Sequence, residues 1–192
     1  MSKINKFIKN YINKISFSIL NLNFKNLDKA ANTIISTIKK NNNIFVCGNG
    51  GSAAIANHYV VDFLKFFKEN SIYKPKIYSL TNSIETITAI SNDISYDKIF
   101  SYQAENLCEK NDLIIIISSS GNSKNIIELI NFAKRKKIKT IGFSGFRGGY
   151  LKKNSNISIH IKAENYGVSE DSHHLLMHGI LQYLIEYFGR KN

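Results

Sequence analysis

The chain has 192 residues, 43% of them hydrophobic, and its 26 Lys and Arg against 14 Asp and Glu give a formal net charge of +12. This length fits one domain with a proper core, and the ordinary apolar content argues against intrinsic disorder. The sequence contains no apolar run long enough for a membrane span, and no signal-peptide core follows its basic start, so we expect a cytoplasmic protein.

The positive charge does not predict a nucleic-acid partner. Lys is over-used together with Asn and Ile along the whole chain, as AT-rich codons would produce, and the basic residues do not alternate with aromatic ones. The densest basic run, residues 134–139, closes a predicted helix, where cations suit the helix dipole. We expect neither nucleic acid nor a membrane as partner. Cys47 and Cys108 lack metal-type spacing and are expected to be buried, reduced thiols.

The first 41 residues predict two amphipathic helices, over 3–22 and 25–41. Apolar residues recur at helical spacing in both, for example at Phe7, Tyr11 and Ile15 in the first helix. Such stripes are not stable in water, so they must cover a sheet or pack against a partner subunit.

From residue 43 the pattern becomes strand, loop and helix, repeated. Strands are expected at 43–47, 76–80, 113–118, 139–143 and 156–161, with helices near 53–68, 84–91, 97–108, 123–136 and 170–188. Near-continuous apolar strands separated by helices predict an α/β fold with a parallel sheet covered on both faces. We find no linker, so residues 1–192 are expected to form one domain, with helices over 1–42 and the ligand-binding core over 43–192.

Two loops follow strands and lead into helices. The glycine loop (residues 48–52, Gly-Asn-Gly-Gly-Ser) follows the first strand, and the serine loop (residues 118–123, Ser-Ser-Ser-Gly-Asn-Ser) follows the third. Glycines let backbone N–H groups converge, and a helix N-terminus adds partial positive charge, so such turns bind anions. Both loops lie where open α/β sheets bind ligands, and together they predict a phosphorylated small molecule. The glycine-rich segment 145–149, which contains Arg147, is expected to form the turn after the fourth strand, with contact to an anion as the alternative.

Two helices carry histidines together with acidic residues. His58 and Asp62 are four residues apart and share one helix face. On the last helix, Glu170 and His178 are about 80° apart around the axis with His174 between them, whereas His173 should face elsewhere. Two such faces can hold a divalent metal, or form a general acid–base pair without one.

The combination of these motifs resembles the sugar isomerase (SIS) domain, and specifically the phosphoheptose isomerases, which act on sedoheptulose 7-phosphate. The resemblance spans essentially the whole chain and is carried by residues 47–52, His58-x-x-x-Asp62, residues 91–93, residues 118–123 and Glu170-x-x-His173-x-x-x-x-His178. It implies a three-layer αβα fold with a five-stranded parallel, flavodoxin-like sheet. It also implies homotetramers with sites between subunits, which would give the N-terminal stripes a partner.

The resemblance assigns roles to individual residues. The implied substrate-binding residues are Asn49, Gly50, Gly51, Ser52, Asn92, Asp93, Ser118, Ser119, Ser120, Ser123 and Glu170, with the serines on the phosphate. The positions that would hold zinc, one divalent ion per site, are His58, Asp62, Glu170 and His178. Asp62 and His178 also match the proton-transfer pair.

Two positions depart from the better-known branch of that family, which has Glu where this chain has Asp62 and Gln where it has Glu170. A second branch, associated with capsule and surface-polysaccharide heptose pathways, is more similar at both positions. An acid at both positions would make a bound zinc more fully neutralised and a weaker Lewis acid, or would select another metal.

The function implied is a ketose–aldose isomerase that forms D-glycero-D-manno-heptose 7-phosphate for lipopolysaccharide or capsule synthesis. Two alternatives stay open. One is a non-catalytic SIS protein, such as an adaptor that binds the replication initiator or a regulator that senses sugar phosphates. The other is an isomerase of a different phosphosugar. An adaptor would need none of the histidines and acids at His58, Asp62, Glu170 and His178, so their presence favours an enzyme.

Overall fold

The computed structural model describes residues 1–189, the side chain of Asn70 excepted. Within this range it contains one sheet of five parallel strands in the order β2-β1-β3-β4-β5. The strands are β1 (Asn43–Gly48), β2 (Lys76–Ser79), β3 (Leu113–Ser118), β4 (Lys139–Ser144) and β5 (Ile157–His160). The α/β class and the flavodoxin-like five-stranded parallel sheet predicted from the sequence are therefore confirmed.

Helices connect the strands. They are α1 (Lys3–Leu20), α2 (Phe24–Lys39), α3 (Gly51–Asn70), α4 (Ile84–Asp93), α5 (Ile99–Leu107), α6 (Lys124–Lys136), α7 (Gly149–Asn154) and α8 (Tyr166–Phe188), with a 3-10 turn η1 (Tyr96–Lys98) before α5. The last helix begins four residues earlier than predicted because the Asn165 side chain caps it, accepting from the Val168 N–H at 3.0 Å. The helix α7 was not predicted, since its six residues are too few to show a periodic pattern.

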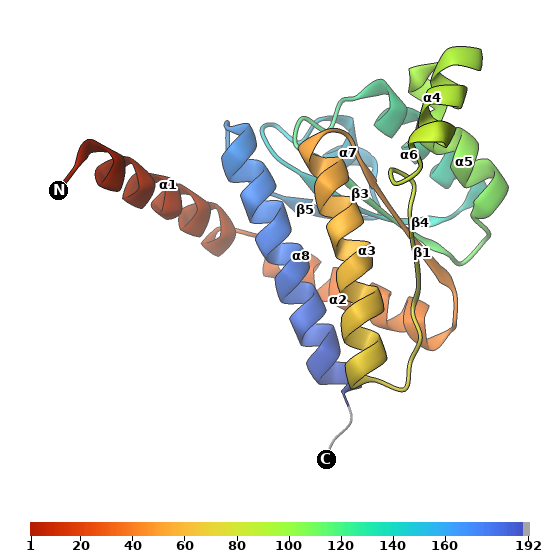
Figure 1. Cartoon of the computed structure of the whole chain (residues 1–192), viewed down its shortest axis with the longest axis horizontal. Helices are drawn as coiled ribbons and strands as arrows, with labels where there is room; N and C mark the ends of the chain where they lie inside the picture. Colours follow the sequence, from red (N-terminus) through yellow and green to blue (C-terminus); the bar gives the residue numbers. More distant parts are fainter. Residues whose placement is uncertain (190–192) are drawn as a thin grey trace.

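The sheet lies between two helical layers (Figure 1), and alternate residues of its central strands pack against one layer or the other. In β3, Ile115 and Ile117 pack with α2, α3 and α8, whereas Ile114 and Ile116 pack with α4, α5, α6 and α7. The strand is buried on both faces, which explains its unbroken apolar sequence. The three-layer αβα arrangement expected from the resemblance is confirmed.

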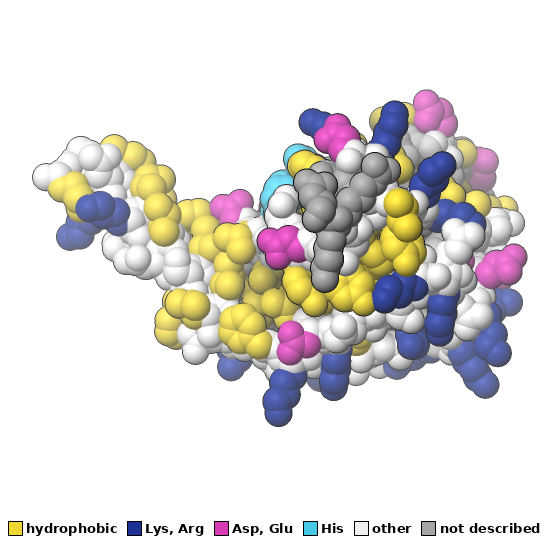
Figure 2. Space-filling model, turned by 90° about the horizontal axis from the view of Figure 1, so that it is seen from below, with side chains coloured by type: hydrophobic (Ala, Val, Ile, Leu, Met, Phe, Trp, Pro, Cys, Tyr) yellow, Lys and Arg dark blue, Asp and Glu magenta, His cyan; other side chains and the backbone are white. Residues whose placement is uncertain are grey.

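The two N-terminal helices have different environments. In α2, Ala30, Ile34 and Ile38 are buried against the sheet, as predicted for a covering helix. Figure 1 shows α1 projecting from the body of the molecule, and Figure 2 shows hydrophobic side chains along it. The exposed apolar residues of α1 are Ile4, Phe7, Ile8, Ile12, Phe17 and Leu20. The apolar face of α1 thus lacks a covering layer within residues 1–189.

The helix α1 is tied to α8 by a side-chain hydrogen bond. The Tyr11 hydroxyl donates to Asp171 Oδ2 at 2.6 Å, and partial burial together with this carboxylate raises the pKa of Tyr11 to about 12. No helix within residues 1–189 combines the length and the apolarity that crossing a membrane requires.

Candidate active site

The glycine loop makes a tight turn between β1 and α3. Gly50 has φ +55°, a region that favours glycine, and it stands directly before the first residue of α3. A Cβ on Gly48 would lie 2.6 Å from Ser52 Cβ, so this position has room only for hydrogen. The loop therefore delivers the N-terminus of α3 to the carboxyl edge of the sheet, where ligands are expected.

Asn49 of the glycine loop is held by two side chains that sequence reasoning missed. Its amide pairs reciprocally with the Asn125 amide, both hydrogen bonds being 2.9 Å long. The Tyr96 hydroxyl donates to Asn49 Oδ1 at 3.0 Å. Nothing in the local sequence around Tyr96 or Asn125 marks this role, because the three residues meet only through the tertiary fold.

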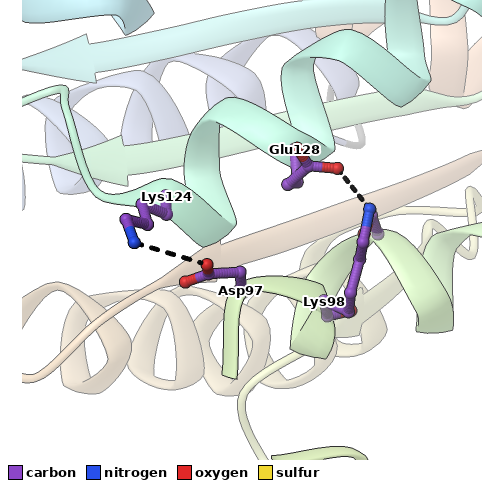
Figure 3. A network of polar contacts seen from close by, with 5 residues as sticks. Asp97, Lys98, Lys124 and Glu128 are labelled. Carbon is purple, nitrogen blue, oxygen red and sulfur yellow. Dashed lines mark hydrogen bonds and ion pairs between the residues drawn. The ribbon is translucent and has the colours of Figure 1, made fainter. Parts of the chain in front are cut away.

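The segment that carries Tyr96 is also attached to α6 by ion pairs (Figure 3). Lys98 Nζ lies 2.5 Å from Glu128 Oε2, and Lys124 Nζ lies 3.9 Å from Asp97 Oδ2. All four side chains are at least one-third exposed, so each pair contributes little stability by itself. Their effect is to keep η1 beside the start of α6.

The serine hydroxyls of the serine loop differ in whether they already make a hydrogen bond. Ser118 Oγ accepts from the Gly121 N–H at 3.2 Å, and Ser120 Oγ accepts from the Asn122 N–H at 3.3 Å. Ser119 Oγ is buried without a hydrogen-bond partner in residues 1–189. Ser123 stands at the N-cap of α6 but makes no side-chain cap hydrogen bond, which leaves its hydroxyl available for another acceptor.

The glycine-rich segment 145–149 and the first turn of α7 donate hydrogen bonds to the serine loop. The Gly145 N–H donates to the Ser119 carbonyl at 2.9 Å, and the Leu151 N–H donates to the Gly121 carbonyl at 3.0 Å. Gly121 has φ +67°, and a Cβ there would lie 2.1 Å from the Gly148 carbonyl oxygen. The sequence predicted a simple turn for this segment, whereas the structure uses it to fix the serine loop.

A histidine cluster forms where α3 and α8 pack together; it consists of His58, Asp62, His174 and His178. Asp62 Oδ2 lies 3.3 Å from His58 Nε2 and 3.0 Å from His178 Nε2. The rings of His174 and His178 stack with their centroids 4.3 Å apart, and the His58 ring lies edge-on to both. The structure thus brings together His58, Asp62 and His178 of the predicted metal set.

Glu170, the fourth residue of the predicted metal set, lies at the glycine loop. A Cβ on Gly51 would meet its carboxylate, with Oε2 only 2.4 Å away. The carboxylate is therefore at the N-terminus of α3, where a negative charge is favoured. Partial burial raises the pKa of Glu170, and the neighbouring Asp171 charge raises it further.

His173 points away from the cluster, as the helical spacing predicts. It is fully buried beside Phe143, and burial lowers its pKa to about 4. The Ser144 backbone offsets part of this shift, although neither ring nitrogen has a hydrogen bond of normal geometry to the described residues. His173 is thus a neutral core residue at pH 7.

Asn92 and Asp93, expected to bind sugar hydroxyls, are exposed at the end of α4. Asn92 Nδ2 donates to Asp93 Oδ1 at 2.8 Å. Both residues precede η1, whose Tyr96 contacts the glycine loop through Asn49. Within one chain they therefore lie on the segment that leads to the site.

The residues of the histidine cluster suit a divalent cation. One ring nitrogen from each of His58, His174 and His178 lies within 4.8 Å of the other two. His174 Nε2 is buried and has no hydrogen-bond partner among the residues described. Neutral imidazole together with a carboxylate is a donor set that zinc and related first-row metals prefer. A metal bound through His174 Nε2 would give that nitrogen a partner.

Known proteins resemble this chain in sequence and in fold. The sequence profile of the SIS domain matches residues 7–145. The chain is 38% identical over 181 residues to a probable phosphoheptose isomerase of Thermoplasma acidophilum, covering 94% of this chain and 98% of that protein. It is 35% identical over 162 residues to a phosphoheptose isomerase of Campylobacter concisus, covering 84% and 85%.

Solved structures agree with the sequence relatives. A phosphoheptose isomerase from Francisella tularensis superposes with a TM-score of 0.87 at 27% identity, over 97% of this chain and 100% of that one. The phosphoheptose isomerase of Neisseria gonorrhoeae gives a TM-score of 0.85 at 26% identity, over 96% and 97%. The similarity therefore extends over the N-terminal helices as well as the sheet.

Proposed function

This chain belongs to the phosphoheptose isomerase family of SIS-domain proteins and is a sugar-phosphate isomerase; we propose that it interconverts sedoheptulose 7-phosphate and D-glycero-D-manno-heptose 7-phosphate. The observation that carries the proposal is a carboxylate and an imidazole, Asp62 and His178, that meet from separate helices 3.0 Å apart. They lie on α3 and α8, the two helices whose N-terminal parts reach the glycine loop.

The proposed ketose–aldose isomerisation requires few catalytic side chains. Moving a proton between C1 and C2 of the sugar passes through an enediol, which requires a base for the carbon proton and an acid for the oxygen. We assign these roles to Asp62 and His178 as a pair, either of which can act as the acid or the base. Each such group typically contributes a factor of ~10²–10⁴ in rate.

The phosphate end is assigned to the serine loop. Ser118, Ser119, Ser120 and Ser123 are the proposed phosphate ligands, and Asn49, Gly50, Gly51 and Ser52 line the sugar, together with Asn92, Asp93 and Glu170. The free hydroxyl of Ser123 at the start of α6 supports this assignment, because it adds a donor where the helix dipole favours an anion. The Glu170 carboxylate at the start of α3 disfavours a phosphate there, which supports the assignment of the phosphate to the serine loop.

A divalent metal, with zinc as the candidate, would be held between His58, Asp62 and His178 and would polarise the sugar carbonyl when bound. Asp62 would then have to share its carboxylate between the ion and the substrate proton. The carboxylate has two oxygens for this, of which Oδ2 faces both histidines.

Assembly and pathway are part of the same proposal. The uncovered apolar face of α1 is suited to a second copy of this chain, consistent with the homotetramer that the resemblance implies. We assign the product to heptose synthesis for a surface polysaccharide, lipopolysaccharide or capsule. The cytoplasmic location expected from the sequence stays a prediction.

The proposal is tested with purified protein, added zinc and sedoheptulose 7-phosphate, following the anomeric protons of the product by NMR. We expect formation of an aldoheptose 7-phosphate and incorporation of solvent deuterium at the reacting carbon. Five- and six-carbon ketose phosphates serve as competing substrates. Turnover of one of these with sedoheptulose 7-phosphate left unchanged would contradict the substrate, and no turnover of any would contradict the activity.

A further inference from the structure

The histidine cluster contains one more potential ligand than the family resemblance assigns. His174 lies one helical turn before His178, and its ring is stacked on that of His178 at 4.3 Å. The His58 ring approaches the His174 ring to 4.8 Å, which is closer than its 5.1 Å approach to His178. His174 is therefore as central to the cluster as the two histidines that were predicted to bind metal.

The Nε2 atom of His174 makes no hydrogen bond to the described residues. It is buried from solvent and without a hydrogen-bond partner, a state that costs about 1–3 kcal/mol for a polar group. His58 and His178, in contrast, both have Asp62 as a partner. An ion placed among the three imidazoles would give His174 the partner that it lacks.

Glu170 does not compete for this position in the observed arrangement. Its carboxylate lies against Gly51, which precedes His58 by seven residues, or about 10 Å along α3. His174 lies one turn further along α8 than Glu170, on the side of His178. On α8, Glu170 therefore lies at the glycine loop, whereas His174 lies in the histidine cluster.

We propose that His174, and not Glu170, is a metal ligand in this protein, so that the ion is bound by three imidazoles and the Asp62 carboxylate. The proposal rests on the metal site of the proposed function and assigns its ligands. Zinc–nitrogen bonds of about 2.0–2.1 Å allow two nitrogens on one ion to be no more than about 4 Å apart. The three nitrogens, now within 4.8 Å, need side-chain movements of less than about 1 Å to close on an ion.

This ligand set has a chemical consequence. With Asp62 as its one anionic ligand, a divalent ion keeps a net positive charge, whereas Asp62 and Glu170 together would neutralise it. The ion then retains more of its Lewis acidity, and imidazole-rich coordination favours zinc, copper, nickel or iron over magnesium and calcium. Glu170 stays at the glycine loop, where it can contact the sugar.

The test is a metal titration of the full chain, independent of catalysis. Metal-free protein is titrated with Co²⁺, whose visible spectrum reports coordination, and the zinc form is measured by X-ray absorption. We expect about three imidazoles per ion in the wild type, and two in His174→Gln, with a dissociation constant raised by more than ~100-fold. Glu170→Gln should stay within a few-fold of wild type. His160→Gln, on β5, is the matched control histidine.

The possible outcomes distinguish the ligand assignment from the metal site itself and from the isomerase activity. Loss of metal affinity in Glu170→Gln with unchanged affinity in His174→Gln would overturn the ligand assignment while leaving the isomerase proposal intact. A wild-type protein that turns over the sugar phosphate but binds no Co²⁺ or Zn²⁺ would overturn the metal site alone. Metal bound through three imidazoles in a protein that isomerises no sugar phosphate would support the ligand assignment and contradict the proposed activity.

Discussion

The serine loop and the histidine cluster hold their functional groups by different means. The serine loop is fixed through its backbone, by hydrogen bonds from Gly145 and Leu151 and by glycine contacts too close for a side chain. The histidine cluster is built from side chains of α3 and α8 that lie about two to three turns into each helix. Backbone positioning suits an anion whose charge stays constant, whereas side chains on helices can exchange protons and bind a metal.

The largest effect is expected from removing the charge at the centre of the histidine cluster. In Asp62→Asn, the carboxylate that contacts both His58 and His178 becomes a neutral amide of the same size. We expect kcat to fall by ~10²–10⁴-fold with a smaller change in KM, because the group acts in proton transfer. Asp28→Asn, on α2, is the control, because no hydrogen bond or ion pair joins Asp28 to the described residues of the cluster. An Asp62→Asn enzyme with near wild-type kcat would remove Asp62 from the mechanism.

Breaking the backbone support should instead affect substrate affinity. Gly121→Ala places a Cβ 2.1 Å from the Gly148 carbonyl oxygen at φ +67°, so the serine loop and segment 145–149 must separate. We expect a KM for sugar phosphate raised more than about tenfold and a loss of about 1–3 kcal/mol in unfolding free energy.

The matched control for that change is Gly179→Ala on α8. A methyl group at this position would meet no described atom within 4 Å apart from its chain neighbours and the backbone of its own helix, and the backbone there is helical. Alanine should raise stability by up to about 1 kcal/mol, as measured by urea unfolding. Equal KM values for the two variants would show that the serine loop does not depend on its glycine contact.

The sequence predicted these two regions unequally. The serine and glycine loops were found from local motifs, because a strand, a glycine turn and a helix start are adjacent in the chain. The faces of His58 and Asp62, and of His174 and His178, followed from helical spacing alone. The role of Asn125 and Tyr96 could not be predicted, since they meet Asn49 only after distant segments pack. The position of Glu170 likewise depends on how α8 lies against α3.

A smaller effect should come from the histidine beside the cluster that takes no part in it. The pKa of His173 is about 4 in the native state against an ordinary 6.5. Below pH 6.5 the unfolded chain binds a proton that the native state does not, so this contribution is full above pH 6.5 and is lost between pH 6.5 and 4. Between pH 7 and 5 the loss amounts to about 2 kcal/mol.

The measurement is urea unfolding of metal-free wild type and His173→Leu at pH 7 and pH 5. Leucine cannot be protonated, so the variant should lose up to about 2 kcal/mol less over this interval. The same pH dependence in both proteins would show that His173 is not the group responsible. Ion binding to the neighbouring histidines is avoided by a chelator in both samples.

The smallest effect should come from the tertiary contact that links the glycine loop to η1. Tyr96→Phe removes one hydrogen bond, 3.0 Å long, from the hydroxyl of a half-exposed side chain to Asn49 Oδ1, while Asn125 still holds the same amide. A neutral hydrogen bond of this kind contributes about 0.5–1.5 kcal/mol, so KM should rise only a few-fold with kcat nearly unchanged. Tyr102→Phe, an exposed tyrosine on α5, is the control. If Tyr96→Phe lowers kcat as strongly as Asp62→Asn, then η1 acts on the chemistry itself, and the separation between a backbone-built binding loop and a side-chain-built reaction centre does not hold.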